Sequence, residues 1–223
     1  MERVKHHLGM NMAFVVEQVG MGGGLMMLCK HGWRMNLLSS SVGHIDVIIH
    51  SPNGDAFHVT GFYGHFEVHN RKHSWELLRR LHHGVNGPWL VLGDFYEVLA
   101  AEEQRGCRER PIGQMTQFKN AISDYSLISF PFKGYPFTWA GRRNESIMTE
   151  VRLDRGLANA DLLNQFPDLL IQHLDTVGSN YKPILLNVST NLPQQQGRKN
   201  ALRFQFEQMW VQEASCKEVV NEA

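Results

Sequence analysis

The chain has 223 residues, of which 43% are hydrophobic and 20% charged, a globular composition that excludes wholesale disorder and suits one α/β domain with a substantial core. Its 22 basic and 22 acidic residues cancel, so the overall positive field that nucleic-acid-binding domains usually carry is absent. Three widely spaced cysteines and the lack of a long apolar run predict a soluble intracellular protein, with no disulfide framework, zinc spacing or membrane span.

The amino-terminal third predicts an antiparallel meander of short strands. Alternating or apolar segments occur at 14–19, 25–29, 33–38, 45–49 and 57–63, separated by turn-forming stretches such as Ser51 to Asp55. Meander strands that precede the first helix argue against a doubly wound parallel sheet with strict strand–helix alternation. We therefore expect an α/β fold of two packed sheets flanked by helices.

The rest of the chain predicts a mixture of helices and strands. Helices are expected at 70–83, 114–125 and 159–166, the last capped by Asn159. Trp89 to Leu92 is apolar on both faces and predicts a central buried strand. A hairpin is expected from 136–139 and 148–153 around a loop at 141–146, followed by strands at 169–174 and 184–188. Residues 189–199 resemble a polar linker, and 202–223 a helix, which divides the chain into domains at 1–190 and 191–223.

Two eye-catching clusters favour ordinary structural roles. The glycines from Gly20 to Gly24 lack the Gly-Lys-Ser/Thr of a P-loop, and Leu25 stands where a dinucleotide fingerprint needs glycine, so a tight turn is favoured. His69 and His73 lie four residues apart without the Glu of a zinc protease motif, which favours surface histidines. The basic residues of the second half could meet phosphates, but acidic residues are interleaved with them, which favours solvated loops. We predict no small-molecule cofactor.

Five short motifs are more specific in their order than any one of them alone. They are Gly61-Phe62-Tyr63-Gly64, Trp89-Leu90-Val91-Leu92-Gly93-Asp94-Phe95, Gly134-Tyr135-Pro136-Phe137-Thr138-Trp139, Arg152-Leu153-Asp154-Arg155 and Ser179-Asn180-Tyr181-Lys182-Pro183-Ile184. Together they resemble the endonuclease/exonuclease/phosphatase superfamily and, more narrowly, the endonuclease domain of plant LINE-type (non-LTR) retroelements. The resemblance covers about residues 1 to 190, and the tail is similar to the segment that leads toward a reverse transcriptase. It implies a DNase I-like four-layered sandwich of two mainly antiparallel sheets flanked by helices, missing its first strands.

The resemblance implies a Mg²⁺-dependent phosphodiester hydrolase that acts on DNA. It matches Tyr63 to the tyrosine whose hydroxyl meets the phosphate and Asp94 to the aspartate that positions and deprotonates the attacking water. From its position alone, just past a buried strand, Asp94 is equally well explained as a turn former. The resemblance matches Asp154 to the aspartate that orients the catalytic histidine.

The resemblance also implies a surface for DNA around Trp139, Arg142 and Arg143, where stacking and cationic contacts would hold the polymer. The alternative for Trp139 is a core aromatic of a strand. Nuclear localisation follows from the family's work on chromosomal DNA alone, and the oligomeric state is left open.

The chain departs from the family pattern in two ways. The family's first Asn and its metal-binding Glu belong to strands that precede the matched region, and Glu17 does not replace them. Tyr96 stands where the family has Asn, Asn180 where it has Asp, and Tyr181 where it has the catalytic His. A tyrosine with a pKa of about 10 is neutral at pH 7 and lacks an imidazolium's charge.

We therefore expect a remnant of a retroelement endonuclease that is inactive or nearly so and binds Mg²⁺ poorly, which leaves its status as an enzyme open. The alternative is a non-catalytic module that binds nucleic acid in the cleft where the family's catalytic site lies. A third possibility is a chain that does not fold stably, because missing strands would expose a sheet edge and part of the core.

Overall fold

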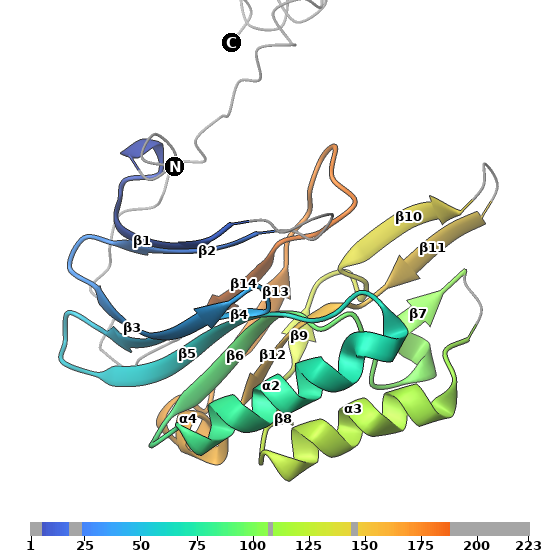
Figure 1. The fold of residues 1–223 in the computed structure, drawn as a ribbon. Coiled ribbons are helices and arrows are strands. Elements are labelled where there is room, and N and C mark those ends of the chain that lie inside the picture. Colours follow the sequence, from blue (N-terminus) through green and yellow to red (C-terminus); the bar gives the residue numbers. More distant parts are fainter. Residues whose placement is uncertain (1–5, 18–23, 107–108, 144–146, 188–223) are drawn as a thin grey trace, which may run out of the picture. The chain divides into compact units, whose positions relative to one another are not determined.

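A six-stranded sheet forms the centre of the computed structural model, which describes residues 6–17, 24–106, 109–143 and 147–187 (Figure 1). Its strands, in spatial order, are β3 (Arg34–Ser41), β4 (His44–His50), β5 (Ala56–Tyr63), β6 (Trp89–Asp94), β12 (Asp154–Ala158) and β8 (Ile128–Ser129). All neighbours are antiparallel except β5 and β6, which run parallel. The meander expected before the first helix is thus present as β3, β4 and β5.

Three smaller sheets accompany the central one. They are β1 (Met10–Val16) with β2 (Leu25–Lys30); β10 (Trp139–Arg143) with β11 (Ile147–Val151) and β7 (Gln104–Arg105); and β14 (Ile184–Asn187) with β13 (Leu170–His173) and β9 (Phe132–Lys133). The pairing is antiparallel except between β13 and β9. The α/β class with mainly antiparallel sheets is therefore confirmed.

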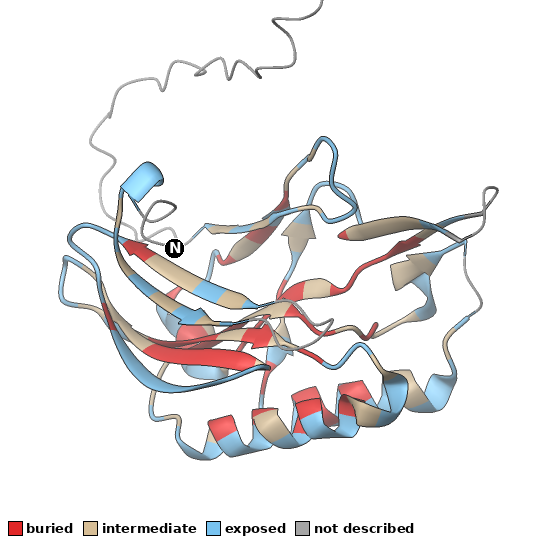
Figure 2. Cartoon of the chain, turned by 45° about the horizontal axis from the view of Figure 1, so that its top comes forward, coloured by how far each residue is buried: buried red, intermediate tan, exposed pale blue. Residues whose placement is uncertain are grey.

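Helices α2 (Arg71–His83) and α3 (Ile112–Asp124) lie side by side on one face of the central sheet (Figure 1). Trp75 and Leu78 of α2 and Phe118 of α3 are buried in one apolar cluster with Trp89 of β6. Figure 2 shows the buried residues of the helices on the side toward the sheet. The apolar spacing that predicted the helices is thus the spacing that anchors them.

The other face of the central sheet has its own core. Val47, Val59 and Leu90 are buried there, packed against side chains of β1, β2, β13 and β14. The short helix α4 (Ala160–Gln165) joins this core through Leu162, and its N-cap is the one expected: the Asn159 side chain accepts a hydrogen bond of 3.1 Å from the Leu162 N–H. Because side chains alternate along β6, the strand is buried on both faces, as its sequence predicted.

Some boundaries were wrong. The loop expected from Gly141 is still strand, since β10 continues to Arg143. Strand β12 and the two-residue strands β7, β8 and β9 were not predicted, and neither were the 3₁₀ turns Val68–Asn70 and Ala101–Glu103. The expected linker at 189–199 and helix at 202–223 lie outside the described residues and stay predictions. Within the described residues, no helix is both long and apolar enough to cross a membrane.

Candidate active site

Three strand ends bring the predicted catalytic residues Tyr63, Asp94 and Asp154 into one row. Tyr63 is the last residue of β5 and lies opposite Asp94, the last residue of β6, and Asp94 lies opposite Asp154, the first residue of β12. Residues directly opposite each other on neighbouring strands share a face of the sheet. The two carboxylates and the phenol therefore stand side by side, on the face away from α2.

Gly93 allows this row to form. Its φ of +148° is a conformation that other residues rarely adopt, and a Cβ atom there would lie 1.9 Å from the carbonyl oxygen of Phe62. The glycine therefore permits the close approach of β5 and β6 just before Asp94.

The two carboxylates lie next to each other, Asp94 buried and Asp154 half-buried. Burial, and then the charge of Asp154, raise the pKa of Asp94 to about 7, although the backbone N–H of Tyr96 donates a 2.8 Å hydrogen bond to Asp94 Oδ1. Burial also raises the pKa of Asp154, opposed by a hydrogen bond with the Thr138 side chain. The Oδ2 atom of Asp154 is buried without a hydrogen-bond partner in the described part of the chain. Near neutral pH the pair therefore retains part of a proton.

Three tyrosines gather beside these carboxylates. The hydroxyl oxygens of Tyr63 and Tyr96 lie 3.0 Å apart, within hydrogen-bond distance, and their rings pack edge to face. Burial raises the pKa of Tyr96 well above its usual range, as do the hydrogen bond to Tyr63, the charge of Asp94 and a hydrogen bond with Tyr181. Tyr96 and Tyr181, whose pKa values are raised, therefore stay neutral, and the hydroxyl of Tyr63, the expected phosphate contact, is engaged with another protein group.

The backbone at Tyr96 has a φ of +54°. Asn is enriched in this left-handed region, whereas a bulky aromatic residue is uncommon there. The position thus keeps a conformation that suits the Asn expected from the resemblance, while its side chain is a phenol.

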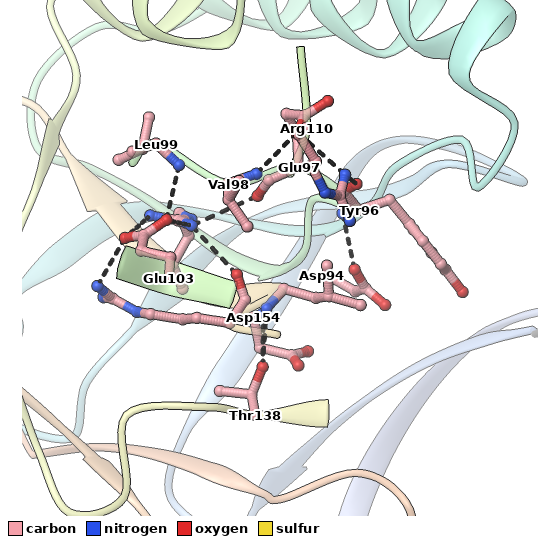
Figure 3. A network of polar contacts seen from close by, with 12 residues as sticks. Asp94, Tyr96, Glu97, Val98, Leu99, Glu103, Arg110, Thr138 and Asp154 are labelled. Carbon is pink, nitrogen blue, oxygen red and sulfur yellow. Dashed lines mark hydrogen bonds and ion pairs between the residues drawn. The ribbon is translucent and has the colours of Figure 1, made fainter. Parts of the chain in front are cut away.

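Buried ion pairs fix the segment that follows Asp94 (Figure 3). Glu97, only 1% exposed, accepts hydrogen bonds from Arg71 Nη1 at 2.5 Å and Arg110 Nη1 at 3.0 Å. Arg110 also donates to the carbonyl oxygen of Tyr96 at 2.7 Å. The backbone that carries Tyr96 is thus held from two sides.

A second cluster joins the same segment to β12. Glu103 pairs with the fully buried Arg155 at 2.7 Å and with Arg152 at 3.1 Å. Sequence reasoning treated these charges as solvated loops, which was wrong, because their partners lie about fifty positions apart in the chain. The pairing of β6 with β12 brings Glu103 close to Arg152 and Arg155.

An open pocket of about 390 Å³ lies beside the tyrosines, and we call it the cleft pocket. It is lined by Phe66, Arg71, Tyr96, Gln104, Arg110, Trp139, Thr149, Val151, Leu153 and Tyr181. Trp139 is half-buried at its wall and forms an isolated β-bridge with Tyr181. The pocket therefore combines aromatic rings with two guanidinium groups.

Of the three residues predicted to meet DNA, Trp139 and Arg142 do not lie on the same face of β10. Arg142 is exposed on β10 and does not line the cleft pocket. Strand alternation puts its side chain on the opposite face of β10 from Trp139, because the two are three residues apart in a continuous strand. The side chain of Arg143 lies outside the described residues. Arg71 and Arg110 are the cleft's cations; Arg110 was noticed only within the basic second half, and Arg71 was missed.

Comparisons with known proteins identify the fold of the chain, through solved structures and not through sequence matches. No family model matches the sequence, and no curated protein does. The endonuclease domain of TRAS1, a telomere-specific non-LTR retrotransposon, superposes with a TM-score of 0.63 at 13% identity, over 81% of this chain and 81% of that chain. The chain has the endonuclease/exonuclease/phosphatase fold. A 3′ phosphatase, NExo from Neisseria bound to a product DNA hairpin, agrees: its TM-score is 0.55 at 14% identity, over 84% of this chain and 82% of its own.

An endonuclease/exonuclease/phosphatase family protein from Bacteroides thetaiotaomicron has the same fold, with a TM-score of 0.51 at 14% identity, over 82% of this chain and 74% of that chain. At such identities the comparisons establish the fold alone. The chemistry must therefore be judged from the residues of this chain.

The donor set does not fit the Mg²⁺ ion implied by the resemblance. Magnesium prefers charged carboxylate oxygens in an octahedral arrangement. Asp94 and Asp154 share a buried environment that favours protonation, and Asn180 adds no charge. Among the residues that the structure describes, no group of three or more His, Cys, Asp and Glu side chains is placed to hold a metal ion. Glu17, exposed just past the end of β1, belongs to no such group.

Proposed function

We propose that this chain is a relative of non-LTR retroelement endonucleases that binds nucleic acid in the cleft pocket without hydrolysing it. The observation that carries the proposal is the hydroxyl contact of 3.0 Å between Tyr63 and Tyr96, beside the buried Asp94 and the half-buried Asp154. This contact occupies the hydroxyl of Tyr63, which the resemblance assigns to the phosphate. DNA is the expected polymer, and the nucleus the expected location, because the resembled proteins work there.

Asp94 can accept a proton, but Tyr96 and Tyr181, at the positions of the family's Asn and His, carry no positive charge for a reacting phosphate. A general base works best with a pKa near the ambient pH, and Asp94, with a pKa of about 7, meets that condition. The cleavage of a phosphodiester also needs stabilisation of developing negative charge. Tyr96 and Tyr181 are neutral phenols whose pKa values are raised further, first of all by burial. Losses of single catalytic groups typically cost about 10²–10⁴ in rate, though they do not add within one site.

The cleft pocket retains the means of binding. An aromatic face such as that of Trp139 stacks with any base, and each stacked base is worth about 1–3 kcal/mol. Arg110 has one guanidinium nitrogen on Glu97 and the Tyr96 carbonyl, and it still lines the pocket. Stacking beside a cation is the combination that holds single-stranded nucleic acid.

The test is a fluorescence anisotropy titration of a labelled single-stranded octanucleotide with the full chain at about 50 mM salt. Replacing Trp139 by Ala should weaken binding about 5- to 150-fold, the equivalent of 1–3 kcal/mol. Trp33→Ala is the matched control, since Trp33 is 36% exposed, between β2 and β3, and does not line the cleft pocket. Circular dichroism melts of both variants verify folding. The proposal fails if the wild-type chain shows no binding, or if both tryptophan variants bind as it does.

A further inference from the structure

A pocket of about 250 Å³ lies at the opposite end of β5 from Tyr63, and we call it the turn pocket. It is lined by Trp33, Ser51, Pro52, Asn53, Asp55, Phe57 and Phe166, none of which lines the cleft pocket. Phe57 is the second residue of β5 and Tyr63 the last, so about 20 Å of strand separates the turn pocket from the candidate active site. We propose that the turn pocket binds the methylated ammonium group of an organic cation.

The register of the central sheet places Trp33 and Asp55 on two sides of Ser51. Arg34 lies opposite His50 on the neighbouring strand, so Trp33 comes beside Ser51, one residue further along each strand. The Ser51 N–H in turn donates a hydrogen bond of 2.8 Å to the carbonyl oxygen of Asp55. The three residues therefore follow one another across the ends of three strands, and two strand spacings leave about 10 Å between the outer two. The small side chain of Ser51 leaves that space open.

Three aromatic rings supply the other walls. Phe57 and Phe166 pack edge to face, with ring centres 6.1 Å apart and an angle of 72° between the rings, and so form a corner. Phe57 follows Asp55 by two residues, so strand alternation puts the two side chains on the same face of the sheet, where Phe166 is buried in the core. Trp33, 36% exposed between β2 and β3, adds the third ring.

Hydrogen bonds within the β4–β5 turn hold the carboxylate in place. Ser51 Oγ accepts hydrogen bonds from the Asp55 N–H at 3.1 Å and the Asn53 N–H at 3.2 Å, and it donates to Asp55 Oδ2 at 3.3 Å. The turn that precedes Trp33 lies against this one, since a Cβ atom at Gly32 would be 3.5 Å from Pro52 Cγ. Because these walls are already fixed, little conformational entropy is lost when a ligand binds.

The half-buried Asp55 gives the turn pocket a negative charge that no cation of the described residues pairs with. Within those residues its side chain makes one hydrogen bond, from the serine hydroxyl, and no ion pair. Arg34 and His50 alternate onto the opposite face of the sheet. Lys30 and His31 are exposed and do not line the pocket. A cation supplied by a ligand would therefore meet an unpaired carboxylate.

Aromatic faces around one carboxylate favour an organic cation. The negative face of an aromatic ring attracts a cation, and aromatic cages of this kind recognise quaternary ammonium groups. An unmethylated ammonium is strongly hydrated, whereas methyl groups give the cation an apolar surface that packs on the rings. The volume of about 250 Å³ lies below the roughly 300–1,000 Å³ typical of pockets for drug-sized molecules, which limits the ligand to one such group. A free cation such as choline and a methylated lysine side chain share this chemistry.

The test titrates the full, ¹⁵N-labelled chain with choline. We expect a saturable shift of the Trp33 indole N–H signal, which is identified as the signal missing from Trp33→Phe. The neutral alcohol 3,3-dimethylbutan-1-ol, which has the shape of choline without its charge, should bind at least 5-fold more weakly. The affinity of each variant is measured from the methyl signal of choline.

The variants separate the aromatic face from the charge. Trp33→Leu should weaken choline binding about 5- to 30-fold, and Trp33→Phe, which keeps an aromatic face, should restore most of it. Asp55→Asn keeps the acceptor for the Ser51 hydroxyl but removes the charge, and should weaken binding about 2- to 5-fold. Asp124→Asn, at an exposed position of α3, is its matched control and should change nothing. Circular dichroism melts show that each variant is folded.

The outcomes are independent of the proposed function, because Trp33→Leu should leave octanucleotide binding unchanged. No binding of choline, equal binding of the neutral alcohol, or guanidinium bound as tightly as choline overturns the proposal. Choline binding that Trp139→Ala removes and Trp33→Leu leaves intact overturns the site. A peptide with one trimethyl-lysine that binds more tightly than choline, while its unmethylated form does not bind, supports the proposal and identifies a methylated lysine as the source of the cation.

Discussion

The raised pKa of Asp94 predicts that its replacement by Asn stabilises the protein, and increasingly so as the pH rises. The pKa moves from 3.8 to about 7, a shift of about three units, and each unit is worth 1.36 kcal/mol. The native state therefore binds a proton that the unfolded state has already lost between these two values. The free energy of unfolding falls by about 1.4 kcal/mol per pH unit between these two values. Above pH 7 it is therefore about 4 kcal/mol lower than at a pH below both values. Asn keeps the acceptor for the Tyr96 N–H and carries no charge to bury.

Urea unfolding of the wild type and Asp94→Asn at pH 5 and pH 8 measures the effect. We expect Asn to raise the free energy of unfolding by about 4 kcal/mol at pH 8 and by less than about 2 kcal/mol at pH 5. Asp168→Asn, at an exposed position, serves as the control and should show no such pH dependence. An equal gain at both pH values, or a loss at pH 8, would refute the assignment of a buried, protonated carboxyl pair.

The buried ion pairs and the strand contact at Gly93 give two further predictions. Glu97→Ala leaves two arginines without their buried partner and should cost about 3–5 kcal/mol in urea unfolding, whereas the exposed Glu102→Ala should cost little. Gly93→Ala forces a Cβ against the carbonyl oxygen of Phe62 and should cost on the order of 3 kcal/mol. Gly113→Ala, where a Cβ meets nothing within 4 Å, is its control in the same thermal melt, and an equal effect at both glycines would contradict the reasoning.

The fold class could be predicted because it depends on patterns local in the sequence. Alternating segments before the first helix gave the meander, and the apolar run at Trp89 gave the buried central strand. Strand β12 could not be predicted in the same way. It carries Arg155, which is fully buried only because Glu103, 52 positions away, neutralises it. A charged residue in a core strand is hidden from any local pattern.

The candidate site could be predicted from the sequence only in part. The position of Asp94 after a buried strand marked it, and the resemblance supplied Tyr63 and Asp154, but their alignment follows from strand register across β5, β6 and β12. The substitution at Tyr96 was seen, whereas its hydroxyl contact with Tyr63 was not. Arg142 was expected in a loop that begins at Gly141, but the strand continues to Arg143, so alternation puts Arg142 on the opposite face of β10 from Trp139.

The most direct test of the central claim is a nicking assay on supercoiled plasmid with the full chain in Mg²⁺ or Mn²⁺. The site predicts no more relaxed plasmid than with Asp94→Ala purified in the same way, because Asp94 can accept a proton while the neutral phenols Tyr96 and Tyr181 stand where the resemblance expects Asn and the catalytic His. Metal-dependent nicking by the wild type that disappears in Asp94→Ala would contradict it.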